Sequence, residues 1–260
     1  MRYVYLTSTE LRHTAFLDAL ISEFPSVLIV REPKKQSPST ASAAIPAYKR
    51  AFTDLQSDFF NASSASRYDA LLTEPEAINQ PRYIQAIREI HPDVILAFGC
   101  SVLSQEILKI PNAFVLNIHT GITQLFRGVD SAFWAIHERR PEGIGATVHL
   151  VDHTIDAGDV VLQARPTISE GDTVHHLFFK SVSIGFETLR TALQLLLSGK
   201  IKPQRLIQRG KLYWQSDFNE TALLRVEQQR FHVLHDYLQD KDTRDSAVPI
   251  ISYKENSCQG

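Results

Sequence analysis

Four short runs of consecutive apolar residues constrain the fold of this chain more than any other feature. They cover residues 3–6, 27–30, 94–98 and 113–116. Apolar runs of this length, without polar alternation, are typical of strands that are buried on both faces of a parallel sheet. Between the first two runs, an apolar stripe at helical spacing predicts an amphipathic helix. This order of strand, helix and strand, with short links, predicts an α/β fold with a mostly parallel sheet.

The pattern changes in the second half of the chain. Residues 146–151 and 160–164 are predicted to form two strands that an acidic turn connects. Residues 173–197 carry the apolar periodicity of a long amphipathic helix, which Gly199 would end. These elements complete the main part of the predicted fold.

The segment after Pro203 is predicted to form a separate, small extension. Apolar residues at 206–207 and 212–214 flank a polar Arg-Gly-Lys segment, which predicts a β-hairpin. A helix is predicted over 223–238, followed by a polar and frayed end from about Asp240. We therefore predict two domains, the main one over residues 1–200 and a hairpin-bearing extension over residues 201–260.

Two polar residues close the apolar run at 113–116. Alternation along a strand places Asn117 and His119 on one side and Ile118 on the other. In open α/β sheets, ligands bind at the carboxyl ends of the strands. An amide can donate a hydrogen bond to an oxyanion, and a histidine can take up a proton near neutral pH. The sequence therefore predicts a site for proton transfer and oxyanion stabilisation.

The acidic turn downstream offers a carboxylate partner for His119. Asp152, Asp156 and Asp159 lie between the two predicted strands, and each could orient the imidazole and compensate its charge. Asp156 could equally hold a turn through its side chain, as Asp-x-Gly segments often do.

A metal site is an alternative interpretation of the same region. His119, His149, His153 and Asp152 are residue types that bind zinc. However, His149 lies in a strand pattern, in which residues four positions apart are separated by ~13 Å. One ion could bind both histidines only if the chain bent sharply, so we expect no metal.

The composition excludes several classes of protein. The 260 residues are 43% hydrophobic and 22% charged, with a formal net charge of -2 and no block of Lys or Arg, so we expect neither nucleic-acid binding nor membrane insertion. Two cysteines, Cys100 and Cys258, indicate no disulfide framework and a cytoplasmic setting. The N-terminus begins with a strand pattern rather than a signal peptide, and no apolar run reaches the ~18 residues of a membrane span.

Several motifs, in order along the chain, resemble the formyltransferase catalytic domain. They are Asn117-x-His119, Arg127-Gly128, the segment Gly-Ala-Thr-Val-His at 145–149, and Asp152-x-x-x-Asp156-x-Gly158. The resemblance implies a Rossmann-like fold and transfer of a formyl group from N10-formyltetrahydrofolate to an amine. It implies that Asn117, His119 and Asp156 form the catalytic trio.

The resemblance also implies the residues that bind the two reactants. Folate contacts are expected from Phe98, Gly99, Leu103, Val115, Asp152 and Ile155, and substrate contacts from His13, Arg127 and Gly128. The guanidinium of Arg127 suits a phosphate or a carboxylate, although it could also be a solvated loop residue. The two glycines could let the backbone approach a flat ligand, or could simply form turns.

Within that family, the resemblance favours the sugar N-formyltransferases of surface-polysaccharide (O-antigen) synthesis. The turn after residue 6 lacks the glycine-rich phosphate loop of the enzymes that act on glycinamide ribonucleotide. The segment after Pro203 is shorter than the barrel of the methionyl-tRNA enzymes, and tRNA binding relies on basic charge that this chain lacks. One departure is Gln124, which stands where many relatives have proline.

The expected reaction is direct acyl transfer to the amine of a nucleotide-linked amino deoxysugar. His119 takes the amine proton or helps to hold the oxyanion, Asn117 donates a hydrogen bond to that oxyanion, and Asp156 pairs with His119. A formyltransferase that acts on glycinamide ribonucleotide or methionyl-tRNA, and a non-catalytic nucleotide-sugar-binding protein of the same fold, are the alternatives. Residues 206–214 carry more apolar surface than a short tail can bury within itself, so they must pack on a second copy or on their own catalytic domain, and we expect a homodimer.

Overall fold

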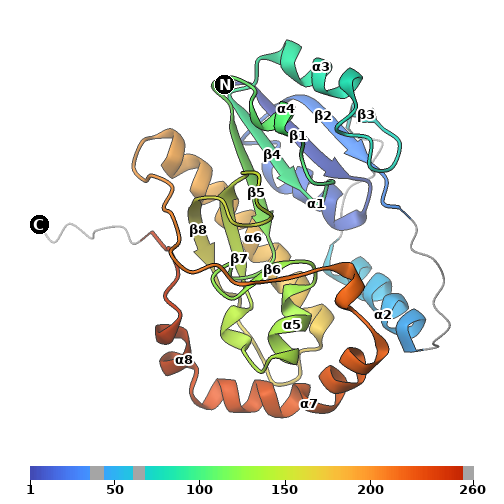
Figure 1. Ribbon diagram of the computed structural model, residues 1–260, viewed down its shortest axis with the longest axis vertical. Helices are drawn as coiled ribbons and strands as arrows, with labels where there is room; N and C mark the ends of the chain where they lie inside the picture. The colour runs from blue at the N-terminus through green and yellow to red at the C-terminus, as the bar shows by residue number, and fades with distance from the viewer. Residues whose placement is uncertain (36–43, 61–67, 254–260) are drawn as a thin grey trace, which may run out of the picture.

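The computed structural model describes residues 1–35, 44–60 and 68–253. Within these residues, a seven-stranded sheet forms the centre of the molecule, with the strand order β3-β2-β1-β4-β5-β7-β8 (Figure 1). The first five strands in this order are parallel, and β7 and β8 are antiparallel to their neighbours. The strands are β1 (Tyr3–Ser8), β2 (Ser26–Glu32), β3 (Leu71–Leu72), β4 (Val94–Phe98), β5 (Phe114–His119), β7 (Ala146–Leu150) and β8 (Val160–Ala164). The predicted mostly parallel α/β fold is confirmed.

Helices cover both faces of this sheet, which is why its central strands are continuous apolar runs. Every residue of β1 and β4 is buried. On one face, Tyr5 packs with α1 (Leu11–Leu20) and α6 (Val174–Leu197). On the other face, Leu6 packs with α3 (Pro81–Ile90) and α4 (Gln105–Leu108). Alternate residues of one strand therefore reach two separate cores.

A third apolar cluster joins the C-terminal segment to the rest of the chain. It contains α5 (Ser131–His137) and α7 (Glu220–Gln239), together with the start of α2 (Ala44–Phe59). Figure 1 shows α7 and α8 (Lys241–Ala247) below α5, at the end of the molecule opposite α3. The predicted helix at 223–238 is confirmed by α7. Two short 3-10 helices occupy Pro141–Gly143 and Gln215–Asp217.

The predicted hairpin in the extension is wrong. Residues 211–213 form β9 (Lys211–Tyr213), which pairs in parallel with β6 (Phe126–Gly128), and Leu206 and Ile207 lie in no strand. The ring of Tyr213 stacks on Trp134 at 4.1 Å between centroids and an interplanar angle of 9°. The partner strand comes from a loop far away in the sequence, so a search for neighbouring strands misses it.

The predicted frayed end after Asp240 is also wrong as far as residue 247. There, α8 is held to the main body by an ion pair between Arg244 and Glu142 at 2.8 Å. Cys258, one of the two cysteines, lies outside the described residues. Among the helices that are described, none has the length and the apolar character needed to cross a membrane.

Candidate active site

The candidate site forms where β5 pairs with β7. The antiparallel register places Asn117 opposite His149 and His119 opposite Thr147. The loop after β7 then returns Asp156 to the same side. The polar residues that end the apolar run of β5 therefore meet residues that the second half of the chain supplies.

His119 is 4% exposed, and hydrogen-bond acceptors surround both nitrogens of its ring. Its Nδ1 lies 3.1 Å from Asp156 Oδ2. Its Nε2 lies 3.1 Å from the carbonyl oxygen of Phe126 and 3.1 Å from Ser131 Oγ. Because a carboxylate and a carbonyl only accept hydrogen bonds, the ring can carry a second proton with both N–H groups paired.

Asp156 is the central group of the site. Its Oδ2 also accepts a hydrogen bond from the backbone N–H of Gly128 at 2.9 Å, and its Oδ1 lies 3.5 Å from Nε2 of His149. Burial alone would raise the pKa of Asp156, but its charge interaction and hydrogen bond with His119, together with His149, lower that pKa well below its ordinary range. The carboxylate is therefore ionised at neutral pH and can stabilise a charged imidazole.

Asn117 and His149 form the second half of the site. His149 Nδ1 lies 2.8 Å from the carbonyl oxygen of Leu150, which requires a proton on Nδ1. Its Nε2 lies 3.2 Å from Asn117 Nδ2, which can donate to that nitrogen when the ring is neutral. Nε2 of His149 therefore lies near both groups: it can accept from the amide of Asn117 when the ring is neutral, or donate to the carboxylate of Asp156 when the ring is protonated.

Of the three candidate aspartates, Asp156 is the one that the structure brings to His119. Asp152 instead accepts a hydrogen bond from the backbone N–H of Thr154 at 2.7 Å, which closes a turn. Asp159 lies 3.4 Å from Arg205. His153 is exposed, and within the described ranges no group of three His, Cys, Asp or Glu side chains has a metal-binding arrangement.

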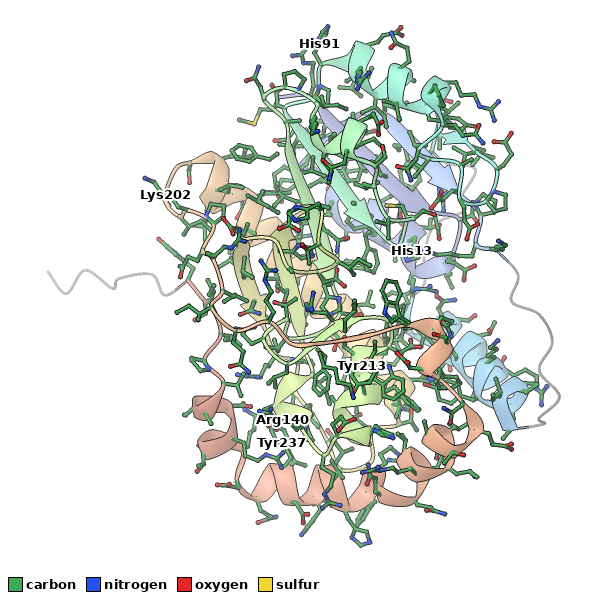
Figure 2. All side chains as sticks on the ribbon, in the orientation of Figure 1. His13, His91, Arg140, Lys202, Tyr213 and Tyr237 are labelled. Carbon is green, nitrogen blue, oxygen red and sulfur yellow. The ribbon has the colours of Figure 1, made fainter. Side chains whose placement is uncertain are left out.

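His13, which Figure 2 labels, lies near the carboxyl ends of β1 and β4 and contacts two of the predicted folate-binding residues, Phe98 and Gly99. The ring of Phe98 faces the core, where it meets His13 edge-on at 4.8 Å between centroids. Gly99 has φ +69, and a Cβ there would lie 2.1 Å from Nε2 of His13. His13 is 2% exposed and hydrogen-bonded to Ser8, so its predicted substrate contact needs a movement of its neighbours.

Three other predicted binding residues, Leu103, Val115 and Arg127, contact the rest of the protein itself. Leu103 and Val115 are buried in the apolar cluster beneath α3 and α4. Arg127 donates hydrogen bonds to the backbone carbonyls of Gly210, at 2.8 Å, and Ile155, at 2.9 Å. These two bonds occupy part of its guanidinium with the chain itself, and they join the loop after β7 to the segment before β9.

Gly128 has a structural requirement besides its hydrogen bond to Asp156. Its φ is +86, and an added Cβ would lie 2.0 Å from the carbonyl oxygen of Tyr213. A side chain at this position would therefore separate β6 from β9 and displace the N–H that reaches the carboxylate.

Two residues of the site were not predicted as catalytic. His149 was considered only as a metal ligand, although the motif at 145–149 contains it, because the strand register that brings it to Asn117 is not visible in the sequence. Ser131 follows a loop without regular structure, and no periodic signal marks its contact with His119.

The profile of the formyl transferase family matches residues 7–192, so the chain belongs to that family. Among curated proteins, it is 33% identical over 135 residues to a methionyl-tRNA formyltransferase from Caldanaerobacter subterraneus subsp. tengcongensis, covering 51% of this chain and 43% of that protein. The chain spans about half the length of the first curated relatives that it matches.

Solved structures are similar over most of the chain. A sugar N-formyltransferase from a Shewanella species has a TM-score of 0.59 and 19% identity, covering 87% of this chain and 88% of that one. An N-formyltransferase from Helicobacter canadensis, solved with folinic acid and dTDP-3-aminofucose, has a TM-score of 0.59 and 14% identity, covering 89% and 81%. At these identities the likeness establishes the fold.

Proposed function

We propose that this protein transfers a formyl group from N10-formyltetrahydrofolate to the amino group of a nucleotide-linked amino deoxysugar. The observation that carries the chemistry is the buried pair of His119 and Asp156, with Nδ1 and Oδ2 at 3.1 Å, beside the amide of Asn117. A base, its anionic partner and a hydrogen-bond donor are the groups that acyl transfer to an amine requires. Family membership supports the same reaction.

In the proposed reaction, the amine nitrogen attacks the formyl carbon and forms the new C–N bond. Asn117 donates a hydrogen bond to the oxyanion that develops on the formyl oxygen. His119 takes the proton that the amine loses, and Asp156 stabilises the resulting imidazolium. The bond from the formyl carbon to N10 then breaks, N10 receives the proton, and the products are a formamide and tetrahydrofolate.

His119 must change a hydrogen bond before it can act. Its Nε2 lies within hydrogen-bond distance of Ser131 and of the carbonyl oxygen of Phe126. Catalytic hydrogen bonds are often rearranged when a substrate binds, so the reacting group would replace one of these partners. No covalent intermediate with the protein is needed.

The coverage of the similar structures supports a sugar acceptor. The likeness to the two N-formyltransferase structures extends over 87% and 89% of the chain. The matches to methionyl-tRNA formyltransferases cover about half of the chain. A formal net charge of -2 also gives little phosphate-neutralising surface for tRNA.

A formyltransferase of methionyl-tRNA is the second candidate. The observation that favours it is the sequence identity of 33% to such enzymes, which is higher than the identity to the sugar enzymes. The two candidates share the donor and the chemistry, so they differ only in the acceptor.

A direct assay separates these functions. Purified protein is mixed with N10-formyltetrahydrofolate and with dTDP-3-aminofucose, methionyl-tRNA or glycinamide ribonucleotide, and the release of tetrahydrofolate is followed. We expect turnover with the nucleotide sugar, and none when His119→Asn replaces the wild type. Turnover with methionyl-tRNA alone would favour the second candidate, and binding of the nucleotide sugar without turnover would favour a non-catalytic protein.

The cellular setting follows from this proposal. The product would enter the synthesis of a surface polysaccharide such as an O-antigen, and the protein would act in the cytoplasm as a homodimer. We also retain the division into a catalytic domain over residues 1–200 and an extension over residues 201–260 as a proposal, with limited proteolysis as its test.

A further inference from the structure

Asp130 lies between two contacts of the candidate active site. Two residues before it, the N–H of Gly128 donates to Asp156, and the next residue, Ser131, reaches Nε2 of His119 at 3.1 Å. Consecutive Cα atoms are ~3.8 Å apart, so the backbone of Asp130 lies within about 10 Å of the His119 ring. This upper limit is compatible with one sugar ring that forms a hydrogen bond at each side.

The backbone of Asp130 has an uncommon conformation. Its φ is 53°, in the left-handed region, where non-glycine residues are uncommon. Asp130 precedes the first residue of α5, a position where aspartate usually caps a helix, yet its side chain makes no capping hydrogen bond. The carboxylate therefore does not cap the helix that follows it.

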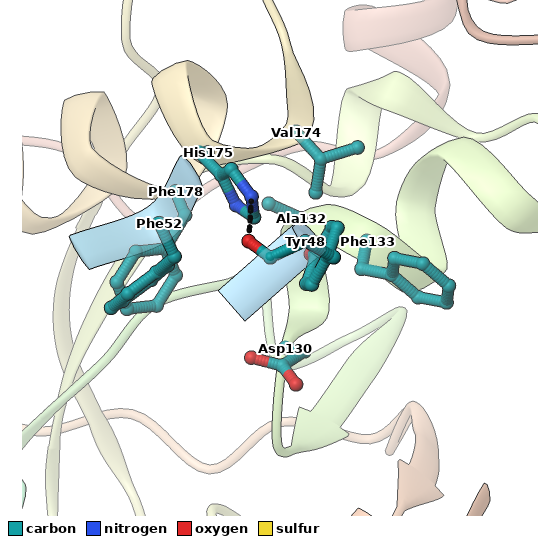
Figure 3. Close-up of a pocket in the computed structure, with 8 residues that line it drawn as sticks. All are labelled: Tyr48, Phe52, Asp130, Ala132, Phe133, Val174, His175 and Phe178. Carbon is teal, nitrogen blue, oxygen red and sulfur yellow. Dashed lines mark hydrogen bonds between the residues drawn. The ribbon is translucent and has the colours of Figure 1, made fainter. Parts of the chain in front are cut away.

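Asp130 is one of the residues that line a small pocket between α2, α5 and α6 (Figure 3). This pocket has a volume of about 30 Å³, and aromatic side chains from all three helices form most of its lining. The aromatic residues are Tyr48, Phe52, Phe133, His175 and Phe178. Figure 3 shows the Asp130 carboxylate apart from these rings. A methyl-sized group would fill the pocket, while a polar neighbour could reach the carboxylate.

No hydrogen bond or ion pair to the Asp130 carboxylate is found in the part of the chain that the structure describes. Its nearby charge is Arg12, which lies beside the ring of Phe52 and donates a hydrogen bond to Gln56 at 2.7 Å. Burial raises the pKa of Asp130, whereas the charge of Arg12 lowers it. A partly buried carboxylate without a donor has a desolvation cost that a ligand could offset.

The chemistry of this subsite selects the kind of group that it binds. A carboxylate only accepts hydrogen bonds, so its ligand must donate through a hydroxyl or an ammonium group. The attacking amine must be neutral and must lie at His119, which leaves the hydroxyl groups of the acceptor for Asp130. The aromatic pocket beside the carboxylate has room only for a methyl-sized group of such an acceptor.

We propose that the carboxylate of Asp130 binds a ring hydroxyl of the acceptor sugar next to its amine and thereby selects which amino sugars react. This assignment rests on the proposed sugar N-formyltransferase function. Asp130 is then a specificity-determining residue, separate from the groups that transfer the proton.

The test uses the full chain, N10-formyltetrahydrofolate and dTDP-3-aminofucose, with two analogues that each lack one of the hydroxyl groups flanking the amine. Asp130→Gly removes the carboxylate and tolerates the positive φ, and Asp130→Asn keeps the shape without the charge. Glu76→Gly, at an exposed position with φ 59°, is the matched control for the backbone change.

We expect Asp130→Gly to raise KM for the complete sugar roughly ten- to a hundredfold, the range for a hydrogen bond to a charged group, with kcat within about threefold. For the wild type, the analogue that lacks the recognised hydroxyl should have a kcat/KM lower by a similar factor than the complete sugar. That analogue should react equally well with the wild type and with Asp130→Gly. Thermal shift with folinic acid should be the same for both proteins.

The outcomes separate the two proposals. An unchanged KM in Asp130→Gly, with an active wild type, would overturn the role of Asp130 alone. A penalty of equal size on all three sugars would also overturn it, because no hydroxyl would then be recognised. A wild type that neither binds nor formylates the nucleotide sugar, as measured by calorimetry and turnover, would overturn both.

Discussion

Two buried histidines lie at the carboxyl ends of the central strands, and their surroundings are electrostatically opposite. His119 is 4% exposed and faces the carboxylate of Asp156. His13 is 2% exposed, and burial together with nearby cations lowers its pKa well below the ordinary value. Those cations are Arg12, Lys34 and Arg31. Burial is nearly the same at both positions, so the neighbouring charges decide what each ring can do.

This difference indicates a division of the sheet edge into two functional halves. At β5, the acceptors around both nitrogens of His119 let the ring hold a proton during a reaction. At β1, His13 is kept neutral and packs between Phe98 and Gly99. The first half suits proton transfer, and in the second half the neutral ring of His13 is part of the packing.

The largest effect is expected from removing the ring of His119. His119→Asn should lower kcat by roughly a hundred- to ten-thousandfold, the range for general acid-base catalysis, because no other described group pairs with Asp156 in the same position. The protein should still bind folinic acid in a thermal-shift assay. A turnover close to that of the wild type would show that a group other than His119 takes the amine proton. The contrast between His119 and His13 would then be refuted.

His235 supplies the matched control for this variant. It is an exposed histidine on α7, which is paired with Glu170 at 2.8 Å and makes no contact with the residues of the candidate site among the described contacts. His235→Asn makes the same chemical change, so a loss of activity in both variants would point to a general defect rather than to catalysis.

Asp156→Asn should have the next largest effect, with a fall in kcat of roughly tenfold or more and a changed pH profile. The folded pKa of Asp156 is well below its ordinary value, so ionisation contributes stability that is present above about pH 4 and lost as the pH falls through the folded pKa. Urea unfolding at several pH values should therefore show a smaller acid loss in the variant. An equal acid loss in both proteins would contradict the pairing.

Much of the fold could be predicted because it is encoded locally. The apolar runs of β1, β4 and β5 and the periodicity of α6 each depend on a few consecutive residues. The pairing of β6 with β9 depends on residues more than eighty positions apart, and the predicted hairpin failed there. Local patterns indicate which segments form strands, but the tertiary fold selects their partners.

The residues of the candidate site also differ in whether local sequence could predict them. Asn117 and His119 could be selected because they end a buried strand, and Asp156 because a resemblance marked it among three aspartates. His149 could not be assigned from spacing, because its role depends on the antiparallel register that sets it opposite Asn117. Asp130 carries no pattern at all, since its significance lies in a left-handed backbone conformation and a missing capping bond.

A smaller effect, on stability, is expected in the half of the site around His13. Gly99→Ala should destabilise the protein by about 2–4 kcal/mol, because φ is +69 and the new Cβ would lie 2.1 Å from a ring that Phe98 confines. Gly171→Ala is the control, since nothing lies within 4 Å of its Cβ. Thermal unfolding should separate the two variants by roughly 5–10 °C, and equal stability would show that His13 is free to move.

The smallest effect concerns the extension and the expected homodimer. The structure buries Tyr213 against Trp134 of the same chain, so the apolar surface that could meet a second copy is reduced to residues such as Ile207, which is fully exposed, and Trp214, which is 52% exposed. A chain that ends at Gly199 would lose α7 and open the third apolar cluster, so point substitutions are the sharper test.

Ile207→Lys combined with Trp214→Lys should weaken the dimer and leave the free energy of unfolding of each subunit nearly unchanged, within about 0.5 kcal/mol for exposed positions. Light scattering over a range of concentrations measures the first effect, and urea unfolding of the monomeric fraction measures the second. Leu224→Lys changes a similarly exposed apolar residue on α7 and serves as the control. A wild type that stays monomeric at high concentration would remove the dimer from the proposal. A dimer that only Leu224→Lys dissociates would move the interface to α7.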